Sequence, residues 1–303
     1  MNPKAGTSWV TEGLIAKQHT VGATVAVLSA GGRASLISVL NAALAARPAP
    51  FKVQLIWSGV DPIPPDVPAE VDRVVVEPKS FDHGGTRQLA LELCDTEVLV
   101  LLTDDAVPAT TSWLEALIRP LVNKRVVAVY GRQLARPSAD FAEQVFRAVR
   151  YPDTSMILTR EHLDSRANVL PVSDANAAYR VRALTALGGF PRRCKSGEDC
   201  VVAAKVLTGG WAVAYAADAP VWHSHSLTWF ELIKRGWMAG VLASARGQER
   251  VVASIGGGIA LVRLMMIAGW RRRRLSGVVT IIWVSWLRAV GYLAGRAFGS
   301  RLP

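Results

Sequence analysis

Two adjacent carboxylates follow a run of apolar residues in the stretch LVLLTDDAVP, residues 99–108. Asp104 and Asp105 repel each other, so a buried strand that ends on both is stabilised by a nearby positive charge. A carboxylate pair in this place can hold Mg²⁺ or Mn²⁺, which take oxygen ligands and bridge carboxylates to substrate phosphates. A helix N-cap ahead of TTSWLEAL, or simple exposure to water, is the alternative interpretation.

Two further stretches place charged side chains where a helix is predicted to begin. In FDHGGTRQLALE, residues 81–92, two glycines come shortly before Arg87. Backbone N–H groups at such a start can bind an anion, and a plain turn before the helix is the alternative, which two glycines alone favour. In SGEDC, residues 196–200, Glu198 and Asp199 open a second helix. One of these carboxylates can act as a general base, or both can simply complement the helix dipole.

Two histidines lie two residues apart in VWHSHS, residues 221–226. On an extended segment His223 and His225 point to the same face. An imidazole nitrogen can complete the ligand shell of Mn²⁺, and a purely structural role is the alternative.

Short apolar segments alternate with segments of helical periodicity through the first half of the chain. This alternation predicts an α/β fold with a mainly parallel sheet and helices on both faces. Ligands bind beyond the carboxyl ends of the strands in such sheets, which places Ser29, Ser58 and the two aspartates along one rim. The predicted strands are 23–29, 52–57, 71–77, 97–102 and 126–131, and the predicted helices are 34–46, 85–94 and 111–121.

The positive charge is concentrated at the C-terminal end. The net charge is +11, and residues 231–303 have 12 Lys or Arg against 2 Asp or Glu, a balance of +10. Residues 1–230 hold the other 23 basic and 22 acidic residues, a balance of +1. A basic chain can indicate nucleic acid, but a basic segment rich in Trp, Leu, Ile and Val favours an anionic membrane surface. We therefore expect a membrane partner and no nucleic-acid partner.

Two apolar segments, 251–270 and 275–298, are long enough to suggest membrane spans. Arg263 and Arg288 interrupt them near the middle, where a charge is costly in a bilayer. The arginines at 271–274 lie between them, so a true span would conflict with the positive-inside tendency. We predict amphipathic helices in the plane of the membrane surface, with spans, a hairpin, a soluble helical cap or an oligomer interface as alternatives. One helical stripe of the second segment would be polar: Ser285, Arg288, Tyr292 and Arg296.

The three cysteines and the N-terminus give expectations about the compartment. Three cysteines without a CxxC pair predict neither a disulfide framework nor a zinc site. The N-terminus lacks the apolar core of a signal peptide. We expect a peripheral protein on the cytoplasmic face of the plasma membrane.

Taken together and in order, four stretches resemble family 2 glycosyltransferases of the GT-A fold, and within them the bacterial rhamnosyltransferase type. They are FDHGGTRQLA, LLTDDAVP, SDANAAYR through GGF, and GEDCVVAAKVLTGGWAVAYAADAPVWHSH, within residues 23–228. The resemblance implies a GT-A domain over residues 1–230, with a nucleotide-sugar half at 23–131 and an acceptor half at 132–230. Residues 231–303 would form a basic helical region for membrane association.

The resemblance also implies roles for single residues. The metal motif of the family, Asp-x-Asp, falls on Thr103 to Asp105, so Asp105 is the predicted metal ligand together with His223. The Glu-Asp motif makes Asp199 the predicted base, with Glu198 beside it. Where the family has an aspartate after its second strand this chain has Trp57, and Asp61 can substitute. The predicted nucleotide-sugar residues are Ser29, Ser58, Asp61, His83, Arg87 and Asp104, and the predicted acceptor residues are Asn176, Trp211 and His225.

The function implied by the resemblance is transfer of a sugar from a nucleotide donor with inversion at the anomeric carbon. Mn²⁺ or Mg²⁺ would be the cofactor, dTDP-L-rhamnose the donor and a lipid-linked glycan the acceptor. A UDP-hexose or GDP-mannose donor is the alternative, and a membrane or nucleic-acid scaffold without enzyme activity is the remote one.

Overall fold

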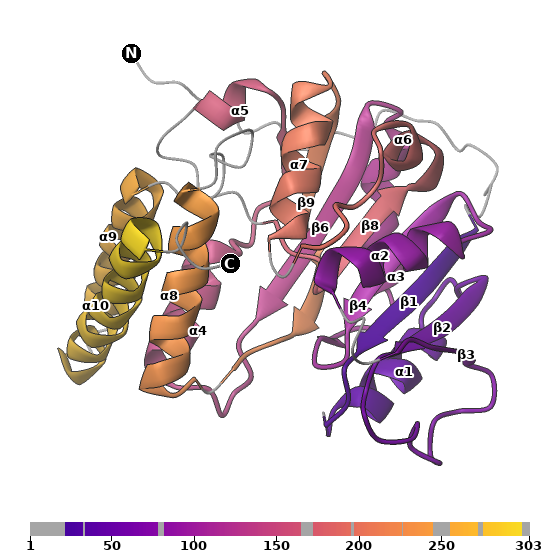
Figure 1. The fold of residues 1–303 in the computed structure, drawn as a ribbon, viewed down its shortest axis with the longest axis horizontal. Coiled ribbons are helices and arrows are strands. Elements are labelled where there is room, and N and C mark those ends of the chain that lie inside the picture. Colours follow the sequence, from indigo (N-terminus) through magenta and orange to yellow (C-terminus); the bar gives the residue numbers. More distant parts are fainter. Residues whose placement is uncertain are drawn as a thin grey trace.

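A computed structural model describes residues 22–32, 34–77, 82–164, 172–194, 197–225, 227–244, 255–271 and 275–298. Its centre is one mixed sheet with helices on both faces (Figure 1), which confirms the predicted fold class. The strands are β1 (Ala23–Ser29), β2 (Lys52–Trp57), β3 (Asp72–Val75), β4 (Val98–Thr103), β5 (Val107–Pro108), β6 (Val126–Leu134), β7 (Met156–Leu158), β8 (Asn176–Arg180) and β9 (Ala212–Trp222).

The order and direction of the strands determine which strand ends lie at the same edge of the sheet. The order is β3-β2-β1-β4-β8-β6-β9-β5, and β7 pairs with β9. Strands β1 to β4 are mutually parallel, β8 is antiparallel to both β4 and β6, and β9 is parallel to β6. The carboxyl ends of β1, β2, β4, β6 and β9 therefore meet at one edge, together with the beginning of β8.

Alternate side chains of each central strand enter different cores. In β1, Val25 and Val27 pack on one face and Ala26 and Leu28 on the other, as the period of a strand requires. The first face is covered by α1 (Leu36–Leu44) and α3 (Trp113–Ile118), which continues into η2 (Arg119–Val122). The second is covered by α2 (His83–Glu92), α6 (Val181–Ala186) and α7 (Glu198–Thr208). A short helix, α5, spans Glu161–Asp164.

Four helices form a separate group beside the sheet: α4 (Phe141–Arg150), α8 (Trp229–Ser244), α9 (Ile255–Arg271) and α10 (Leu275–Phe298) (Figure 1). Helices α8 and α10 approach closely because both carry glycines four residues apart. A Cβ at Gly236 would collide with the carbonyl of Arg288, and one at Gly291 would collide with the carbonyl of Ile233. A small apolar core with Val145 and Ile281 joins α4 to α9 and α10.

The predicted polar stripe of α10 exists, but part of it faces the protein rather than the outside. The guanidinium of Arg288 lies over the ring of Phe146 in α4, 4.9 Å from its centroid, and the carbonyl of Tyr292 abuts Gly240 of α8. The stripe packs there because the two glycines of α8 leave room for the α10 backbone.

The outward face of α10 is apolar. Its exposed large apolar side chains are Val279, Ile282, Trp283, Trp286, Val290, Leu293 and Phe298, and the two indole rings stack with centroids 5.3 Å apart. By length and composition, α10 is the one helix in the described part of the chain that could cross a membrane, from Gly277 to Phe298. The expectations about the N-terminus up to residue 21 and about the arginines at 272–274 lie outside the described residues.

Candidate active site

Three possible metal ligands meet at the edge where the strands end. His223 Nε2 lies 3.3 Å from Asp105 Oδ1, and His225 Nδ1 lies 3.6 Å from Asp105 Oδ2. One ligand atom from each residue falls within 4.8 Å of the other two. One carboxylate and two imidazoles form a donor set that suits Mn²⁺ or another borderline divalent cation. Here His225 joins the metal cluster, although the sequence predicted an acceptor-binding role for it.

The protonation states fit this donor set. Burial lowers the pKa of His223, and it lowers the pKa of His225 to about 3, so both rings are neutral at neutral pH. Burial acts to raise the pKa of Asp105, but its interaction with His223 and the hydrogen bond from Thr103 outweigh burial, and that pKa lies well below its usual range. A neutral imidazole has a lone pair, and an ionised carboxylate has several, so all three groups can bind a cation.

The two adjacent aspartates are directed to different partners. Thr103 Oγ1 donates a hydrogen bond to Asp105 Oδ1 (2.8 Å), and Ser29 Oγ donates one to Asp104 Oδ2 (2.6 Å). Ser35 Oγ donates to the carbonyl oxygen of Asp104 (3.0 Å). Asp105 thus faces the histidines while Asp104 faces the end of β1, which confirms that Ser29 and Asp104 lie together.

A second cluster of charges lies under the start of α2 and α7. Arg87 Nε is 2.8 Å from Asp174 Oδ2 and 3.0 Å from Glu198 Oε1, and all three side chains are buried. Burial raises the pKa of Asp174 to about 8 against the opposing charge of Arg87, and burial also raises the pKa of Glu198. Two carboxyl groups share one guanidinium. With a proton on Asp174 at neutral pH, the single positive charge of Arg87 is matched by the single negative charge of Glu198. The role of Arg87 beside the nucleotide-sugar stays a prediction.

Asp199 is the more open member of the Glu-Asp pair. Helix α7 starts from Gly197, whose φ of 84° is left-handed. From that start Glu198 turns inward to Arg87, whereas Asp199 is half-buried. Its Oδ1 accepts the backbone N–H of Cys200 (2.7 Å). Asp199 therefore has a carboxylate at the site that is not engaged by Arg87.

The loop after β2 is shaped by Trp57. Its indole lies so close to Gly59 that a Cβ there would collide with the ring, and its Nε1 donates to the carbonyl oxygen of Asp61 (2.9 Å). Ser58 Oγ donates to the carbonyl oxygen of Ser29 (3.1 Å), which ties the ends of β1 and β2 together. Asp61 is exposed, and its predicted contact with the donor stays a prediction.

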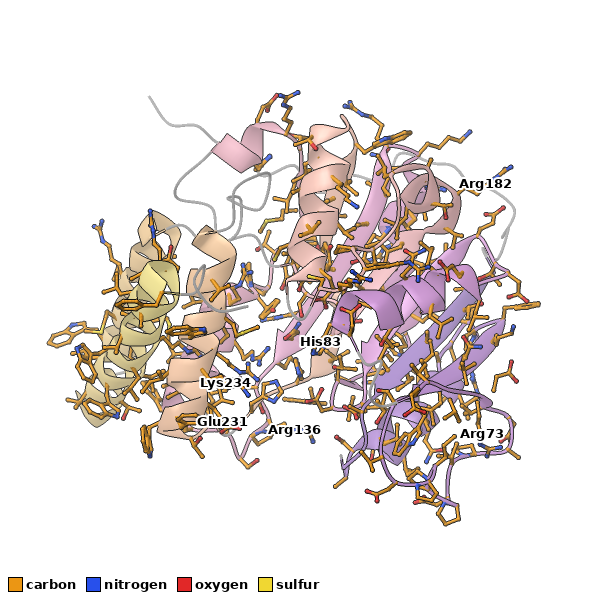
Figure 2. The ribbon with its side chains drawn as sticks, in the orientation of Figure 1. Arg73, His83, Arg136, Arg182, Glu231 and Lys234 are labelled. Carbon is orange, nitrogen blue, oxygen red and sulfur yellow. The ribbon has the colours of Figure 1, made fainter. Side chains whose placement is uncertain are left out.

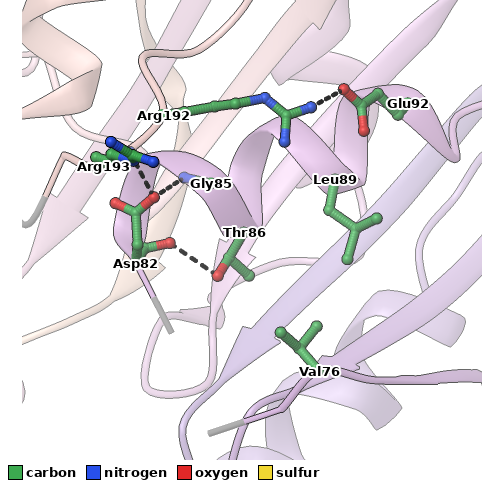
Figure 3. A pocket seen from close by; sticks show the side chains of 8 residues that line it. All are labelled: Val76, Asp82, Gly85, Thr86, Leu89, Glu92, Arg192 and Arg193. Atoms are coloured by element: carbon green, nitrogen blue, oxygen red, sulfur yellow. Dashed lines mark hydrogen bonds and ion pairs between the residues drawn. The ribbon is translucent and has the colours of Figure 1, made fainter. Parts of the chain in front are cut away.

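His83 begins α2, and its carbonyl oxygen accepts a hydrogen bond from Arg87 (3.0 Å). Burial and the neighbouring guanidinium lower the pKa of its imidazole. Asp82 caps the same helix by accepting the N–H of Gly85 (2.9 Å). Figure 3 shows a pocket over this start, lined by Val76, Asp82, Gly85, Thr86, Leu89, Glu92, Arg192 and Arg193.

The two other predicted acceptor residues lie in unlike places. Asn176 is fully buried at the start of β8, near the ligand edge, and its Nδ2 donates to the carbonyl oxygen of Ala219 (2.9 Å). Trp211 precedes β9, so the 11 residues of that strand separate it from His223. The structure therefore corrects the prediction for Trp211, which lies at the opposite edge of the sheet.

The family is decided by a comparison of sequences. The sequence model described as glycosyltransferase-like family 2 matches residues 21–238, which cover the whole sheet and both clusters. The chain belongs to glycosyltransferase family 2. The match ends within α8, so α9 and α10 lie beyond the part that defines the family.

This family 2 chain is similar to two curated O-antigen chain rhamnosyltransferases. It is 34% identical over 170 residues to WbaN of Salmonella anatum, and 33% identical over 168 residues to RfbN of Salmonella typhimurium. Each match covers 55% of this chain and 54% of the relative. The chain thus spans about half the length of the curated relatives it matches.

Solved structures show the same fold at low identity. The mannosyltransferase PcManGT of Pyrobaculum calidifontis, in complex with GDP-Man and Mn²⁺, has a TM-score of 0.59 at 16% identity, covering 92% of this chain and 86% of that one. TarS of Staphylococcus aureus, residues 1–349, has a TM-score of 0.52 at 13% identity, covering 92% and 91%. These likenesses establish the GT-A fold.

Four residues beside the two clusters had no role in the sequence analysis: Gln133, Glu143, Arg147 and Asp174. Asp174 lies inside the stretch SDANAAYR, but only its pairing with Arg87 shows its importance. Glu143 and Arg147 are buried charges four residues apart on α4. Their spacing of four residues on a helix with an apolar face was the sequence signal that could have predicted this ion pair.

Proposed function

We propose that this protein is an inverting glycosyltransferase that moves L-rhamnose from dTDP-L-rhamnose to a lipid-linked glycan, and that a divalent cation assists it. The observation that carries the proposal is the donor set of Asp105, His223 and His225 at the ligand edge of a family 2 sheet. The rhamnosyl choice rests on the similarity to the two O-antigen rhamnosyltransferases.

The residues at the ligand edge of the sheet have the proposed role of binding the cation and the nucleotide. Asp105, His223 and His225 would hold the cation, which when bound offsets negative charge on the departing nucleoside diphosphate. Asp104, held by Ser29, lies beside this group and is the proposed contact for the nucleotide.

The proton is handled by Asp199. Its carboxylate takes the proton of the acceptor hydroxyl as that oxygen forms a bond to the anomeric carbon. The bond from the anomeric carbon to the diphosphate oxygen breaks in the same displacement, and the nucleoside diphosphate leaves with the electron pair. Glu198 is held by Arg87 and so orients the start of α7 rather than taking the proton itself.

A donor panel tests this function. Purified full-length protein is given dTDP-rhamnose, UDP-glucose, UDP-galactose or GDP-mannose with a lipid-linked glycan extract, with Mn²⁺, with Mg²⁺ or with EDTA, and the released nucleoside diphosphate is measured. The proposal predicts dTDP release from dTDP-rhamnose that EDTA stops. Release of UDP or GDP instead would support the alternative donors and overturn the rhamnosyl assignment.

We also propose that the outward face of α10 rests on an anionic membrane surface. Seven large apolar residues are exposed along this helix, and α9 adds exposed Leu264, Ile267 and Trp270. Residues 231–303 carry a surplus charge of +10, which would attract this part of the chain to anionic lipid. Apolar burial and attraction to anionic lipid act together in such helices.

Vesicle sedimentation tests the membrane proposal. Wild type should bind vesicles that contain phosphatidylglycerol more strongly than vesicles of phosphatidylcholine alone, and added salt should weaken the binding. The double variant Trp283→Ser and Trp286→Ser should bind at least about 10-fold more weakly, because two interfacial aromatic side chains are lost. Phe51→Ser is the matched control, since Phe51 is 68% exposed on the sheet side of the molecule. Equal binding of all three proteins to both kinds of vesicle would contradict the proposal.

A further inference from the structure

A chain of buried polar side chains supports His223 from the side away from Asp105. His223 Nδ1 lies 2.8 Å from Gln133 Oε1, at the carboxyl end of β6. The same oxygen accepts a hydrogen bond from Arg147 Nη1 on α4. Arg147 Nε in turn donates to Glu143 Oε1 (2.7 Å). Gln133, Glu143, Arg147 and His223 are each at most 8% exposed, so water does not compete for these bonds.

The chemistry of these groups fixes which nitrogen of His223 carries its proton. A guanidinium only donates hydrogen bonds, so the end of the Gln133 amide that faces Arg147 is the carbonyl oxygen. That oxygen only accepts, so the proton shared with His223 at 2.8 Å is on Nδ1. Arg147 Nη1 also lies 3.5 Å from His223 Nδ1, but this longer contact does not compete with the bond to Gln133. In the neutral ring that binds a cation, the lone pair is therefore on Nε2, the atom that faces Asp105.

Arg147 is itself held firmly. Its guanidinium packs against the rings of Phe146 and Tyr151, 5.7 and 5.8 Å from their centroids. Helix α4 also contributes Val145 to the core shared with α9 and α10. The support of the metal cluster thus comes from the helix that joins the sheet to the C-terminal helices.

A second arginine connects the backbones of the cluster. Arg136, labelled in Figure 2, lies on the connection between β6 and α4. Its guanidinium donates to the carbonyl oxygen of Asp105 (3.1 Å), and its backbone N–H donates to Ser224 Oγ (3.1 Å). Both segments that carry ligands are therefore attached to the chain that runs from Gln133 to Arg147.

We propose that Gln133 and Arg147 are positioning residues for the metal centre: Arg147 orients the Gln133 amide, and Gln133 holds His223 in the Nδ1-protonated tautomer that presents Nε2 to the cation. Neither residue touches the donor or the acceptor in this role. The inference rests on the proposed metal site, and it assigns two residues outside the motifs of the sequence analysis. Loss of such an outer partner typically weakens metal binding by about 10- to 100-fold.

The first test reads the tautomer directly. The chain has five histidines, so ¹⁵N-histidine labelling gives few signals. Long-range ¹H–¹⁵N spectra of the full-length protein with saturating Zn²⁺, a diamagnetic cation that imidazole binds, and assigned with His223→Asn, should show His223 protonated on Nδ1 and not on Nε2. Gln133→Leu should convert this ring to the other tautomer or to a mixture. An Nε2-protonated His223 in the wild type would overturn the proposal.

The second test measures Mn²⁺ affinity by electron paramagnetic resonance, without donor or acceptor. Gln133→Leu and Arg147→Met should weaken binding about 10- to 100-fold, whereas Gln133→Glu, whose carboxylate still accepts both hydrogen bonds, should bind within a few-fold of wild type. Gln54→Leu is the matched control, because Gln54 is a buried glutamine on β2. Urea unfolding in EDTA checks that each variant is folded.

The outcomes separate this proposal from the proposed function. If His223→Ala binds Mn²⁺ like wild type, the metal site itself is wrong. If His223→Ala loses Mn²⁺ while folded Gln133→Leu and Arg147→Met bind like wild type, the metal site stands and the positioning role is overturned.

Discussion

Arg87 Nε lies 2.8 Å from Asp174 Oδ2, and both side chains are buried where α2 and α7 begin. The same nitrogen is 3.0 Å from Glu198 Oε1, so a single guanidinium joins β8 to α7. Arg87 therefore stabilises the backbone that presents Asp199. It links α2 to the two segments that carry Asp174 and Glu198, next to the proposed base.

Replacing Arg87 should destabilise the fold. Arg87→Met leaves the buried Glu198 carboxylate without its counter-ion, and we expect the free energy of unfolding to fall by about 3–5 kcal/mol. Urea denaturation at pH 7 in EDTA measures this. Arg119→Ala is the control, since Arg119 pairs with Asp218 on the exposed surface and its loss should cost at most about 1 kcal/mol. A change for Arg87→Met no larger than that of the control would contradict the buried pair.

Asp174 should make stability fall as pH rises. Its pKa is about 8 in the fold against an ordinary value of 3.8, so the folded state holds a proton that the unfolded state releases between these values. The contribution is present in full below about pH 4 and is lost progressively up to about pH 8, by at most about 1.4 kcal/mol per pH unit. The slope belongs to the metal-free protein, so the titration is done in EDTA.

Asp174→Asn should flatten this slope in urea titrations from pH 5 to pH 8.5. A remainder will come from Glu198, whose pKa is also raised by burial. Asp218→Asn, at an exposed carboxylate, should keep the wild-type slope. If Asp174→Asn and wild type show the same dependence on pH, then Asp174 does not hold a proton in the folded state.

His225 should act on the metal even when no acceptor is present. Its Nδ1 lies 3.6 Å from Asp105 Oδ2, so His225→Ala removes a proposed ligand and should weaken Mn²⁺ binding at least about 10-fold. Electron paramagnetic resonance of the protein alone measures this, with His162→Ala as a control, since His162 bonds to Thr159 beside α5. Unchanged Mn²⁺ affinity with a raised KM for the acceptor would instead support the acceptor role.

The sheet could be predicted because its strands are short and almost wholly apolar. Residues 23–29 and 52–57 match β1 and β2, since buried parallel strands read as continuous apolar runs. Strand β8 was harder to foresee, because NAAYR is made mostly of small residues and only its neighbours β4 and β6 show its direction. Strand β6 runs on to Leu134, beyond the predicted end at residue 131, and so carries Gln133 to the site.

The parts of the site that lie within one sequence motif could be predicted. The spacing of His223 and His225 places both rings on one side of an extended segment, and the structure brings both to Asp105. Pairings between distant segments could not be read from the sequence. Arg87 with Asp174, and Gln133 with His223, depend on how α2, α4 and β9 are packed on the sheet. Trp211 shows that closeness in sequence does not place a residue at the site. It belongs to the same sequence motif as His223, but the two residues lie at opposite ends of β9.

The central claim is that Asp105 serves donor binding while Asp199 serves the reaction. The most direct test measures the dissociation constant of dTDP-rhamnose with Mn²⁺, and the rate of transfer, in the same preparations of wild type, Asp105→Ala and Asp199→Asn. Asp105→Ala should lose the donor binding that depends on Mn²⁺. Asp199→Asn should bind donor like wild type but transfer sugar about 10²- to 10⁴-fold more slowly, because the acceptor hydroxyl keeps its proton. Transfer at the wild-type rate by Asp199→Asn, or unchanged donor binding by Asp105→Ala, would contradict the account.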